Sequence, residues 1–356
     1  MRSKALSKYL TPSLQGLTPY IPGEQPQDRG YIKLNTNESP YHPSPAAVAA
    51  VTAEVLTGLR RYSDPGGAEL RKTIAGTAGL TPEQVVLSNG SDEMLSLAFQ
   101  TFCPGKVTAF PDITYGFYQV LAGLYHLPCR VVPLNDDLTV RLEDYLTPGE
   151  NVVLPNPNAP TGLALPLSEV ERILRAHPDD VVLMDEAYVD FGGDSATALL
   201  GRYENLLVVQ TCSKSRSLAG ARLGYALSSP ALCGDLERVR NSFHPYNVNA
   251  VTQALGTASF RDADYFNACT AKIVATRERF TAELRALGFL LADSRANFVF
   301  ARSPRVAGRD LYLRLKDRGV LVRWFDQERI RDYVRISIGT DGEMDRVVEI
   351  LGELGN

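Results

Sequence analysis

The chain has 356 residues, of which 44% are hydrophobic and 22% are charged, so it can bury a large hydrophobic core and does not have the composition of a disordered segment. Lys and Arg (37) nearly balance Asp and Glu (41), and no basic block of the kind that binds nucleic acid occurs. No apolar run reaches the ~18 residues of a membrane span, and the N-terminal segment lacks the apolar stretch of an export signal. We therefore expect a cytoplasmic protein that binds neither nucleic acid nor membranes.

The cysteines and histidines exclude two further classes of site. The five cysteines are scattered and never form C-x-x-C, which argues against a disulfide framework and a zinc–cysteine site. The four histidines form no H-x-x-x-H pair. We expect no metal.

The predicted elements begin with an arm and a helix. Residues 1–30 contain several prolines and little periodicity, which predicts an extended arm. Ser44 before Pro45 predicts the start of a helix that runs to about Arg60. Further on, short apolar runs predict strands at residues 85–87, 107–109, 130–132, 152–154, 181–184 and 206–209. Strands that are apolar at consecutive positions are typical of a parallel sheet covered by helices on both faces.

The helices between these strands include residues 168–175, for which Ser168 and Glu171 predict a capping box. After residue 260 the pattern changes. A long helix is predicted over 262–287, and a second capping box is predicted at Thr340 and Glu343. The other elements predicted there are strands at 297–300, 320–323 and 333–338 and helices at 308–317 and 344–354.

These elements predict an α/β protein with a large α/β/α sandwich, a mostly parallel central sheet and a smaller C-terminal α+β domain. We place the N-terminal arm at residues 1–30, the large domain at 31–260 and the small domain at 261–356.

Polar residues follow several predicted strands, where ligands bind in open parallel sheets. Gly90-Ser91-Asp92 opens a helix, whose free amides favour a phosphate. Asp185 ends a buried strand, where a carboxylate needs a cation. Lys214 follows the next strand and could form an imine with a carbonyl. A phosphate site, a carboxylate for a protonated ring and an imine-forming lysine together predict pyridoxal 5′-phosphate.

Each of these features alone has a simpler structural explanation. Lys214 alone is typical of a surface lysine, Gly90-Ser91-Asp92 of a helix cap, and the Asn- and Pro-rich segment 155–162 of a loop. The prediction depends on their occurring together, each after a strand.

The segment TCSKSRSLAGARLGY at residues 211–225 resembles the lysine signature, S-x-S-K followed by L-A-G-x-R-x-G, of the class II pyridoxal-phosphate-dependent aminotransferases of fold type I. Within these, the chain resembles the histidinol-phosphate aminotransferases from Leu34 to Thr340. Thr211 replaces the usual first serine of the signature, and N-E-S-P at 37–40 replaces the frequent N-E-N-P. We expect these departures to affect fine substrate selectivity only.

The resemblance implies catalytic roles for Lys214, Asp185 and Tyr188. Lys214 would hold the cofactor covalently and move the proton between Cα and C4′, and Asp185 would pair with the pyridinium nitrogen. Asn158 and Tyr188 would bind the ring's 3′-oxygen. The phosphate would be held by the amides of Ser91 and Asp92, the side chains of Thr211 and Ser213, and Arg222. Tyr115 would stack on the ring, and Tyr62 would reach the phosphate in a neighbouring subunit, which implies a homodimer with active sites at the subunit interface.

On the substrate side, the resemblance implies that Arg335 binds the α-carboxylate and that the loop with Asn37 closes over it. Tyr20 and Arg323 would hold the phosphate of histidinol phosphate. The implied reaction converts histidinol phosphate and 2-oxoglutarate to imidazole acetol phosphate and glutamate, a step of histidine biosynthesis.

Two alternatives keep the cofactor but change the reaction or substrate: a threonine-phosphate decarboxylase and an aminotransferase for aromatic amino acids. A third is a non-catalytic cofactor-binding domain of a transcription regulator, against which stands the lack of a basic DNA-binding extension.

Overall fold

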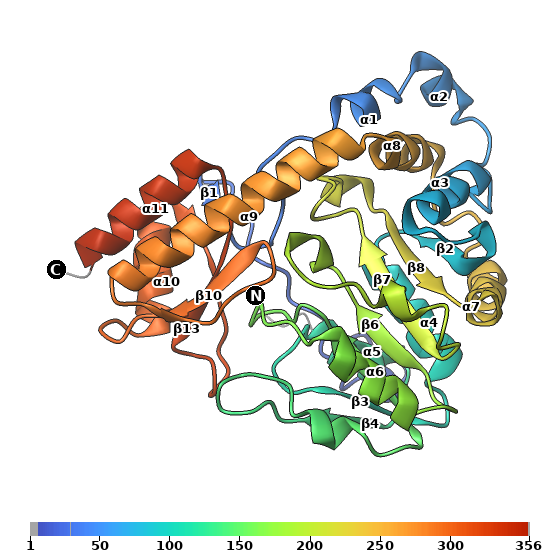
Figure 1. Cartoon of the computed structure of the whole chain (residues 1–356), viewed down its shortest axis with the longest axis horizontal. Coiled ribbons are helices and arrows are strands. Elements are labelled where there is room, and N and C mark those ends of the chain that lie inside the picture. Colours follow the sequence, from blue (N-terminus) through green and yellow to red (C-terminus); the bar gives the residue numbers. More distant parts are fainter. Residues whose placement is uncertain (1–5, 29, 355–356) are drawn as a thin grey trace.

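The computed structural model describes residues 6–28 and 30–354, and its largest element is a seven-stranded sheet (Figure 1). In their order across the sheet, the strands are β2 (Val85–Ser88), β8 (Gly224–Ser228), β7 (Leu206–Thr211), β6 (Val182–Asp185), β5 (Glu150–Pro155), β3 (Val107–Pro111) and β4 (Cys129–Val132). Among these strands β8 runs opposite to the other six, which are parallel to one another. The predicted mostly parallel sheet and its six predicted strands are confirmed, and β8 is an addition.

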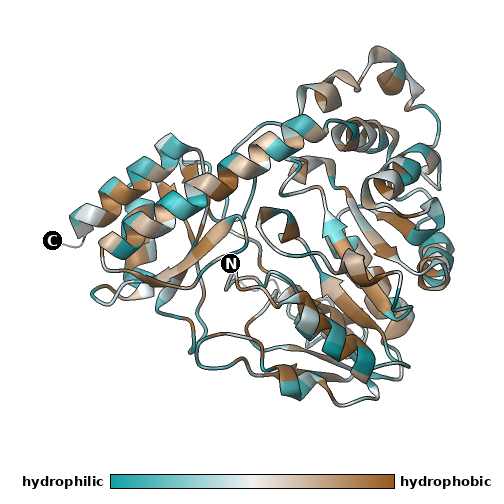
Figure 2. Ribbon diagram, viewed as in Figure 1, coloured by the Kyte–Doolittle hydropathy of each residue, from teal (hydrophilic) through white to brown (hydrophobic). Residues whose placement is uncertain are grey.

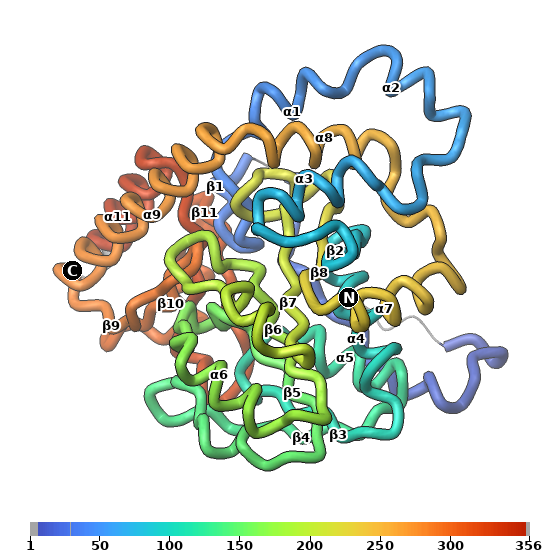
Figure 3. The backbone as a smooth tube through the Cα atoms, turned by 45° about the vertical axis from the view of Figure 1, so that its right-hand side comes forward, coloured from blue at the N-terminus to red at the C-terminus, as the bar shows by residue number. Residues whose placement is uncertain are grey.

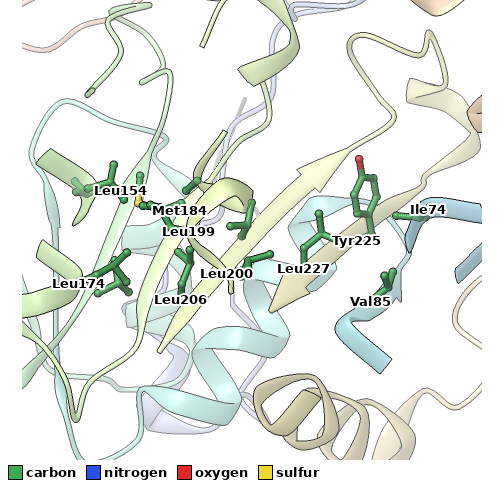
Figure 4. Packing of buried hydrophobic residues seen from close by; sticks show 14 of the residues in the cluster. Ile74, Val85, Leu154, Leu174, Met184, Leu199, Leu200, Leu206, Tyr225 and Leu227 are labelled. Atoms are coloured by element: carbon green, nitrogen blue, oxygen red, sulfur yellow. The ribbon is translucent and has the colours of Figure 1, made fainter. Parts of the chain in front are cut away.

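Both faces of this sheet are buried. Val152 and Leu154 of β5 belong to one hydrophobic core, whereas Val153 between them belongs to another. Figure 4 shows part of the first core, and Figure 2 shows the apolar strands beneath helices whose outer sides are polar. The first core includes side chains of α3 (Ala68–Ala78), α6 (Leu167–Ala176) and α8 (Ala250–Arg261), and the second those of α4 (Ser91–Phe102), α5 (Phe117–Leu124) and α7 (Pro230–Phe243). This double burial explains the apolar runs of the strands.

A second sheet has four antiparallel strands: β12 (Arg323–Trp324), β13 (Tyr333–Ser337), β10 (Phe298–Arg302) and β9 (Leu290–Leu291). It is accompanied by α9 (Ala263–Ala286), α10 (Gly308–Asp317) and α11 (Asp341–Leu354). Figure 3 shows α9 and α11 side by side. The predicted α+β arrangement is therefore present. Leu34 and Phe191 also pack into this C-terminal core. The domain limits at residues 30 and 260 stay a prediction.

A pair of short parallel strands, β1 (Ile32–Lys33) and β11 (Val320–Leu321), connects the end of the N-terminal arm to the C-terminal region. Short 3₁₀ turns lie at η1 (Pro12–Leu14), η2 (Pro82–Gln84), η3 (Leu142–Tyr145), η4 (Val189–Phe191), η5 (Ala196–Leu199) and η6 (Ala219–Ala221). Within residues 6–28 and 30–354, no helix has the length and apolar character needed to cross a bilayer.

The local predictions need three corrections. The helix predicted from Ser44 is two helices, α1 (Pro45–Ala49) and α2 (Ala53–Gly58), because Thr52 caps a new start by accepting a hydrogen bond from the amide of Val55. The capping box at residues 168 and 171 is wrong, since α6 starts at Leu167 with no side-chain cap. The strand predicted over 320–323 is split, because β11 pairs with β1 and β12 with β13. The capping box at residues 340 and 343 is confirmed.

Candidate active site

One cavity of about 410 Å³ lies where the carboxyl ends of β5, β6 and β7 meet the start of α4. It gathers most of the residues for which the sequence predicts a role. They are Tyr20, Asn37, Ser91, Asp92, Tyr115, Asp185, Tyr188, Thr211, Ser213, Lys214, Arg222, Arg323 and Arg335. Asn158 and Tyr62 are not among the described residues that line it.

Asp185 is the last residue of β6 and is almost fully buried. Its Oδ2 accepts a 2.7 Å hydrogen bond from the hydroxyl of Tyr118, and its Oδ1 accepts a weaker one from the amide of Ala187 at 3.3 Å. Burial raises the pKa of Asp185 to about 6, although the hydrogen bond from Tyr118 favours the carboxylate. A positive group in the cavity would complete the environment that this side chain lacks.

Tyr118 is a site residue that sequence reasoning missed. It lies on α5 and is completely buried, with its ring edge-on to that of Tyr115 at a centroid distance of 5.9 Å. The available signal was its position three residues after Tyr115. That spacing alone does not indicate a partner 67 residues away in the chain.

Lys214 follows β7, and its amine points into the same cavity. Its Nζ donates to the backbone oxygen of Thr36 at 2.9 Å and lies 5.9 Å from the ring centre of Tyr188. Burial and the positive charge of Arg335 lower the pKa of Lys214 to about 8. A lysine with such a pKa is partly neutral near pH 7 to 8, and only the neutral amine attacks a carbonyl.

The start of α4 has the shape of an anion site. Its N-cap is Gly90, which has a φ of 85° and supplies no side-chain cap to the first amides of the helix. A Cβ at Gly90 would lie 2.4 Å from Nη2 of Arg222, so the absence of a side chain lets the guanidinium approach the loop. Arg222 also bonds Asp92, whose carboxylate in turn accepts the hydroxyl of Tyr115. Free amides and an adjacent guanidinium fit a phosphate.

Two hydroxyl groups line the same cavity as this anion site. Thr211 ends β7, and its hydroxyl donates to Ser213 Oγ at 2.9 Å and accepts from the amide of Ser213. Both side chains are buried and both residues line the cavity.

Arg335 and Asn37 also line the cavity. Arg335 donates from Nη2 to the carbonyl of Asn35 at 3.0 Å, while its buried Nε has no hydrogen-bond partner among the described residues. Burial lowers the pKa of Arg335. Asn37 adopts a φ of 56° and donates through Nδ2 to the hydroxyl of Tyr188 at 2.9 Å. A guanidinium with an unused donor beside the lysine fits a carboxylate.

Tyr20 and Arg323 bring the N-terminal arm to the cavity. The ring of Tyr20 lies edge-on to Tyr115, and Arg323 donates to the carbonyls of Ile21 and Pro22 at 3.1 and 3.3 Å. The arm is thereby attached across the entrance. A second cavity of about 740 Å³ shares Tyr20 and Arg323 with the first and extends beneath the arm.

Two residues with predicted roles lie outside the cavity wall. Asn158 is buried, and its Nδ2 donates to the carbonyl of Ile113 and to the hydroxyl of Thr161, while its Oδ1 has no partner among the described residues. Tyr62 is 82% exposed, and its ring stacks on that of Tyr246 at 4.4 Å. These contacts neither support nor contradict the roles predicted for Asn158 and Tyr62, which stay predictions.

The model of the family "aminotransferase class I and II" matches residues 29–351. The chain belongs to this family. The predicted resemblance and the prediction of an aminotransferase are thereby confirmed. A histidinol-phosphate aminotransferase of Marinomonas sp. is 52% identical to this aminotransferase over 347 residues, covering 95% of the chain and 97% of the relative. Histidinol-phosphate aminotransferase 1 of Bordetella parapertussis is 49% identical and covers 98% and 99% of the two chains.

Solved structures agree on the fold. A putative histidinol-phosphate aminotransferase of Erwinia carotovora atroseptica matches with a TM-score of 0.83 and 26% identity, covering 91% of this aminotransferase and 96% of that chain. Histidinol-phosphate aminotransferase of Sinorhizobium meliloti, solved in complex with pyridoxal-5′-phosphate, matches with a TM-score of 0.87 and 24% identity over 99% and 98% of the two chains. The predicted fold class is confirmed.

Proposed function

We propose that this aminotransferase moves the amino group of histidinol phosphate to 2-oxoglutarate with pyridoxal 5′-phosphate as its cofactor, and so serves histidine biosynthesis. The observation that carries the proposal is the shared cavity, in which a buried lysine amine and a buried carboxylate lie with the free end of α4. Two relatives at about half identity over nearly their whole length, both named histidinol-phosphate aminotransferases, support the substrate.

The residues of the cavity fit the cofactor in three places. Asp185 would pair with the ring nitrogen, Lys214 would hold the aldehyde carbon, and the start of α4 with Arg222 would bind the phosphate. Tyr115, Thr211 and Ser213 line the same space. The 3′-oxygen would be hydrogen-bonded by Tyr188, which also lines it, and by Asn158, which is not among the described residues of its wall. When bound, pyridoxal 5′-phosphate supplies a protonated ring that accepts the electrons released as the substrate's Cα–H bond breaks.

Lys214 is suited to move the proton between the reacting carbons. Its pKa of about 8 lies close to the pH of the cytoplasm, so the amine can accept a proton and return it. Its hydrogen bond to the carbonyl of Thr36 directs Nζ, and Tyr188 lies beside it. Asp185 would keep its negative charge against the ring nitrogen with the help of the Tyr118 hydroxyl.

The substrates would be held by two neighbouring arginines, because Arg323 of β12 lies directly opposite Arg335 of β13 and both line the cavity. Arg335 would bind the α-carboxylate of glutamate and of 2-oxoglutarate, and Asn37 would lie over that group. Histidinol phosphate has no α-carboxylate, so its phosphate needs another cation, for which Arg323 and Tyr20 lie at the entrance. Because the two amino-group donors share one site, the phosphate contacts would supply much of the selectivity.

We also propose a homodimer in which Tyr62 reaches the cofactor phosphate of the second subunit. Tyr62 is largely exposed and does not line the described wall of the cavity in its own chain, and its ring stacks on that of Tyr246. Val48 on α1, Leu56 on α2 and Leu59 at the C-terminal cap of α2 are also about half exposed, which is typical of a surface that another subunit covers. The five cysteines are free, in keeping with a reducing compartment such as the cytoplasm.

The test is a titration of the pyridoxal-phosphate-loaded enzyme with single amino donors. Conversion of the bound cofactor to pyridoxamine phosphate by histidinol phosphate, but not by phenylalanine, is the expected result. Release of carbon dioxide from threonine phosphate, or equal conversion by phenylalanine, would replace the proposed substrate. A protein that binds no pyridoxal 5′-phosphate would refute the whole proposal.

A further inference from the structure

Glu93 lies in the first turn of α4, directly after Ser91 and Asp92, but it is not among the residues that line the cavity. Only 15% of its side chain is exposed. We propose that Glu93 is a positioning residue that holds the phosphate-binding end of α4 in shape. The proposal rests on the proposed function, because it concerns the group that would bind the cofactor phosphate.

Three donors from two segments, the loop before α4 and the connection after α7, converge on the Glu93 carboxylate. Oε2 accepts from the amide of Asn89 at 2.5 Å and from Nδ2 of Asn247 at 2.7 Å, and Oε1 lies 2.8 Å from Nδ1 of His244. Since a carboxylate only accepts, Nδ1 of His244 carries the hydrogen. Asn89 belongs to the loop between β2 and α4, and His244 is the C-cap of α7. The carboxylate therefore connects the loop to the end of another helix.

The loop has one further side-chain hydrogen bond at this point, in which the hydroxyl of Ser88 donates to the carbonyl of Gly90 at 2.9 Å. Gly90 follows Asn89, has a φ of 85° and provides no side chain that could cap the helix. Glu93 holds the amide before this glycine, while Asn247 also donates to the carbonyl of Leu87 in β2 at 3.2 Å. The segment around Gly90 is thus held at β2 by the hydrogen bond from Asn247 to Leu87, and at α4 by the hydrogen bond from Asn89 to Glu93. Small displacements of these amides would weaken phosphate binding, because donors bind anions well only when they are held in place.

The substitution Glu93→Gln has two physical effects that change the affinity for phosphate in opposite directions, so a measured affinity can test the proposal. The substitution removes a negative charge near the phosphate site, and this alone would tighten phosphate binding. It also replaces one acceptor oxygen by an NH₂ group. Either this group faces the amide of Asn89 and Nδ2 of Asn247, which are also donors, or His244 must change its tautomer so that Nδ1 accepts a hydrogen bond. If Glu93 acts by position, the second effect dominates and the phosphate is bound more weakly.

The experiment compares pyridoxal 5′-phosphate with pyridoxal, which lacks the phosphate. Both are titrated into cofactor-free enzyme by absorbance, and the bound fraction is trapped with borohydride. We expect Glu93→Gln to raise the Kd for pyridoxal 5′-phosphate about tenfold and to leave that for pyridoxal unchanged. An unchanged or lower Kd for pyridoxal 5′-phosphate, or an equal rise for both compounds, would overturn the proposal.

A matched control is Glu237→Gln. Glu237 lies on α7, is 26% exposed and pairs with Arg71 and Arg240, but none of its hydrogen bonds reaches the loop between β2 and α4. It is expected to change neither Kd. Any phosphate-selective loss in Glu237→Gln equal to that of Glu93→Gln would refute a specific role for Glu93.

His244→Ala provides a second variant that leaves the loop and α4 unchanged in sequence. It removes one donor to Glu93 and is expected to raise the Kd for pyridoxal 5′-phosphate about threefold, again without effect on pyridoxal. If Glu93→Gln fails to fold, as its Tm without cofactor would reveal, His244→Ala decides the matter by the same comparison. Failure of the unmodified enzyme to bind pyridoxal 5′-phosphate would instead refute the proposed function.

Discussion

The replacement Asp185→Asn should remove a pH dependence from the stability of the cofactor-free enzyme. Burial raises the pKa of Asp185 from 3.8 to about 6 in the folded chain. Between these two values the folded state binds more protons than the unfolded state, so the free energy of unfolding falls as the pH rises. Above about pH 6 this decrease in the free energy of unfolding is complete. A pKa difference of about two corresponds to a loss of about 3 kcal/mol.

The assay is urea unfolding of cofactor-free enzyme, followed by circular dichroism from pH 4 to pH 8 at one protein concentration, since a dimer's stability depends on concentration. We expect the free energy of unfolding of Asp185→Asn, relative to the unmodified enzyme, to increase by about 2 to 3 kcal/mol over this range. Burial also raises the pKa of the neighbouring Glu186 to about 7, but this group is present in both proteins and cancels in the comparison. Parallel pH profiles for the two proteins would refute the reasoning.

The remaining predictions concern cofactor and substrate. Lys214→Ala should bind no cofactor that borohydride can fix, whereas turnover at the parent rate would exclude Lys214 as the attachment point. Arg335→Lys should raise the KM for glutamate about tenfold with a smaller effect on histidinol phosphate, because a lysine cannot make the bidentate contact and histidinol phosphate has no α-carboxylate; equal effects on both would contradict this role. Tyr118→Phe removes the hydrogen bond to Asp185 and should lower kcat about tenfold in steady-state assays, and an unchanged kcat would show that this contact is dispensable. Tyr62→Phe should release cofactor faster during dialysis, and mixing it with Lys214→Ala should form a hybrid with one intact site; if no such hybrid forms, the active sites are not shared.

The sequence predicted the elements whose signal is local. The consecutive apolar residues Val152, Val153 and Leu154 predicted a strand buried on both faces, and each of them does lie in one of the two cores. The residues that follow such strands line one cavity, as the topology of parallel sheets requires. The capping box at Thr340 was also predictable, because both partners lie within four residues. The helix after Ser44 was predicted too long, since a cap in its middle starts a second helix.

What the sequence could not predict depends on contacts between distant segments. Strand β8 runs back against β7 and β2, and nothing in residues 224–228 specifies that direction. Tyr118 meets Asp185 only because α5 packs on the same face of the sheet as the end of β6. Glu93 resembled an ordinary acidic residue in a first helical turn, and its role depends on donors more than 150 positions away in the chain.

The buried charges of the cavity are arranged for charged ligands rather than for stability. Burial raises the pKa of Asp185 and lowers the pKa values of Lys214 and Arg335, so each group is held in the folded chain against its preferred charge state. A cationic ring nitrogen would offset the burial penalty of the Asp185 carboxylate, and an anionic substrate carboxylate would offset that of the Arg335 guanidinium. A ligand that binds only the folded state stabilises that state by mass action. The cofactor would in addition remove the burial penalty of the Asp185 carboxylate. Cofactor binding should therefore stabilise the fold most at a pH above 6, where Asp185 is ionised.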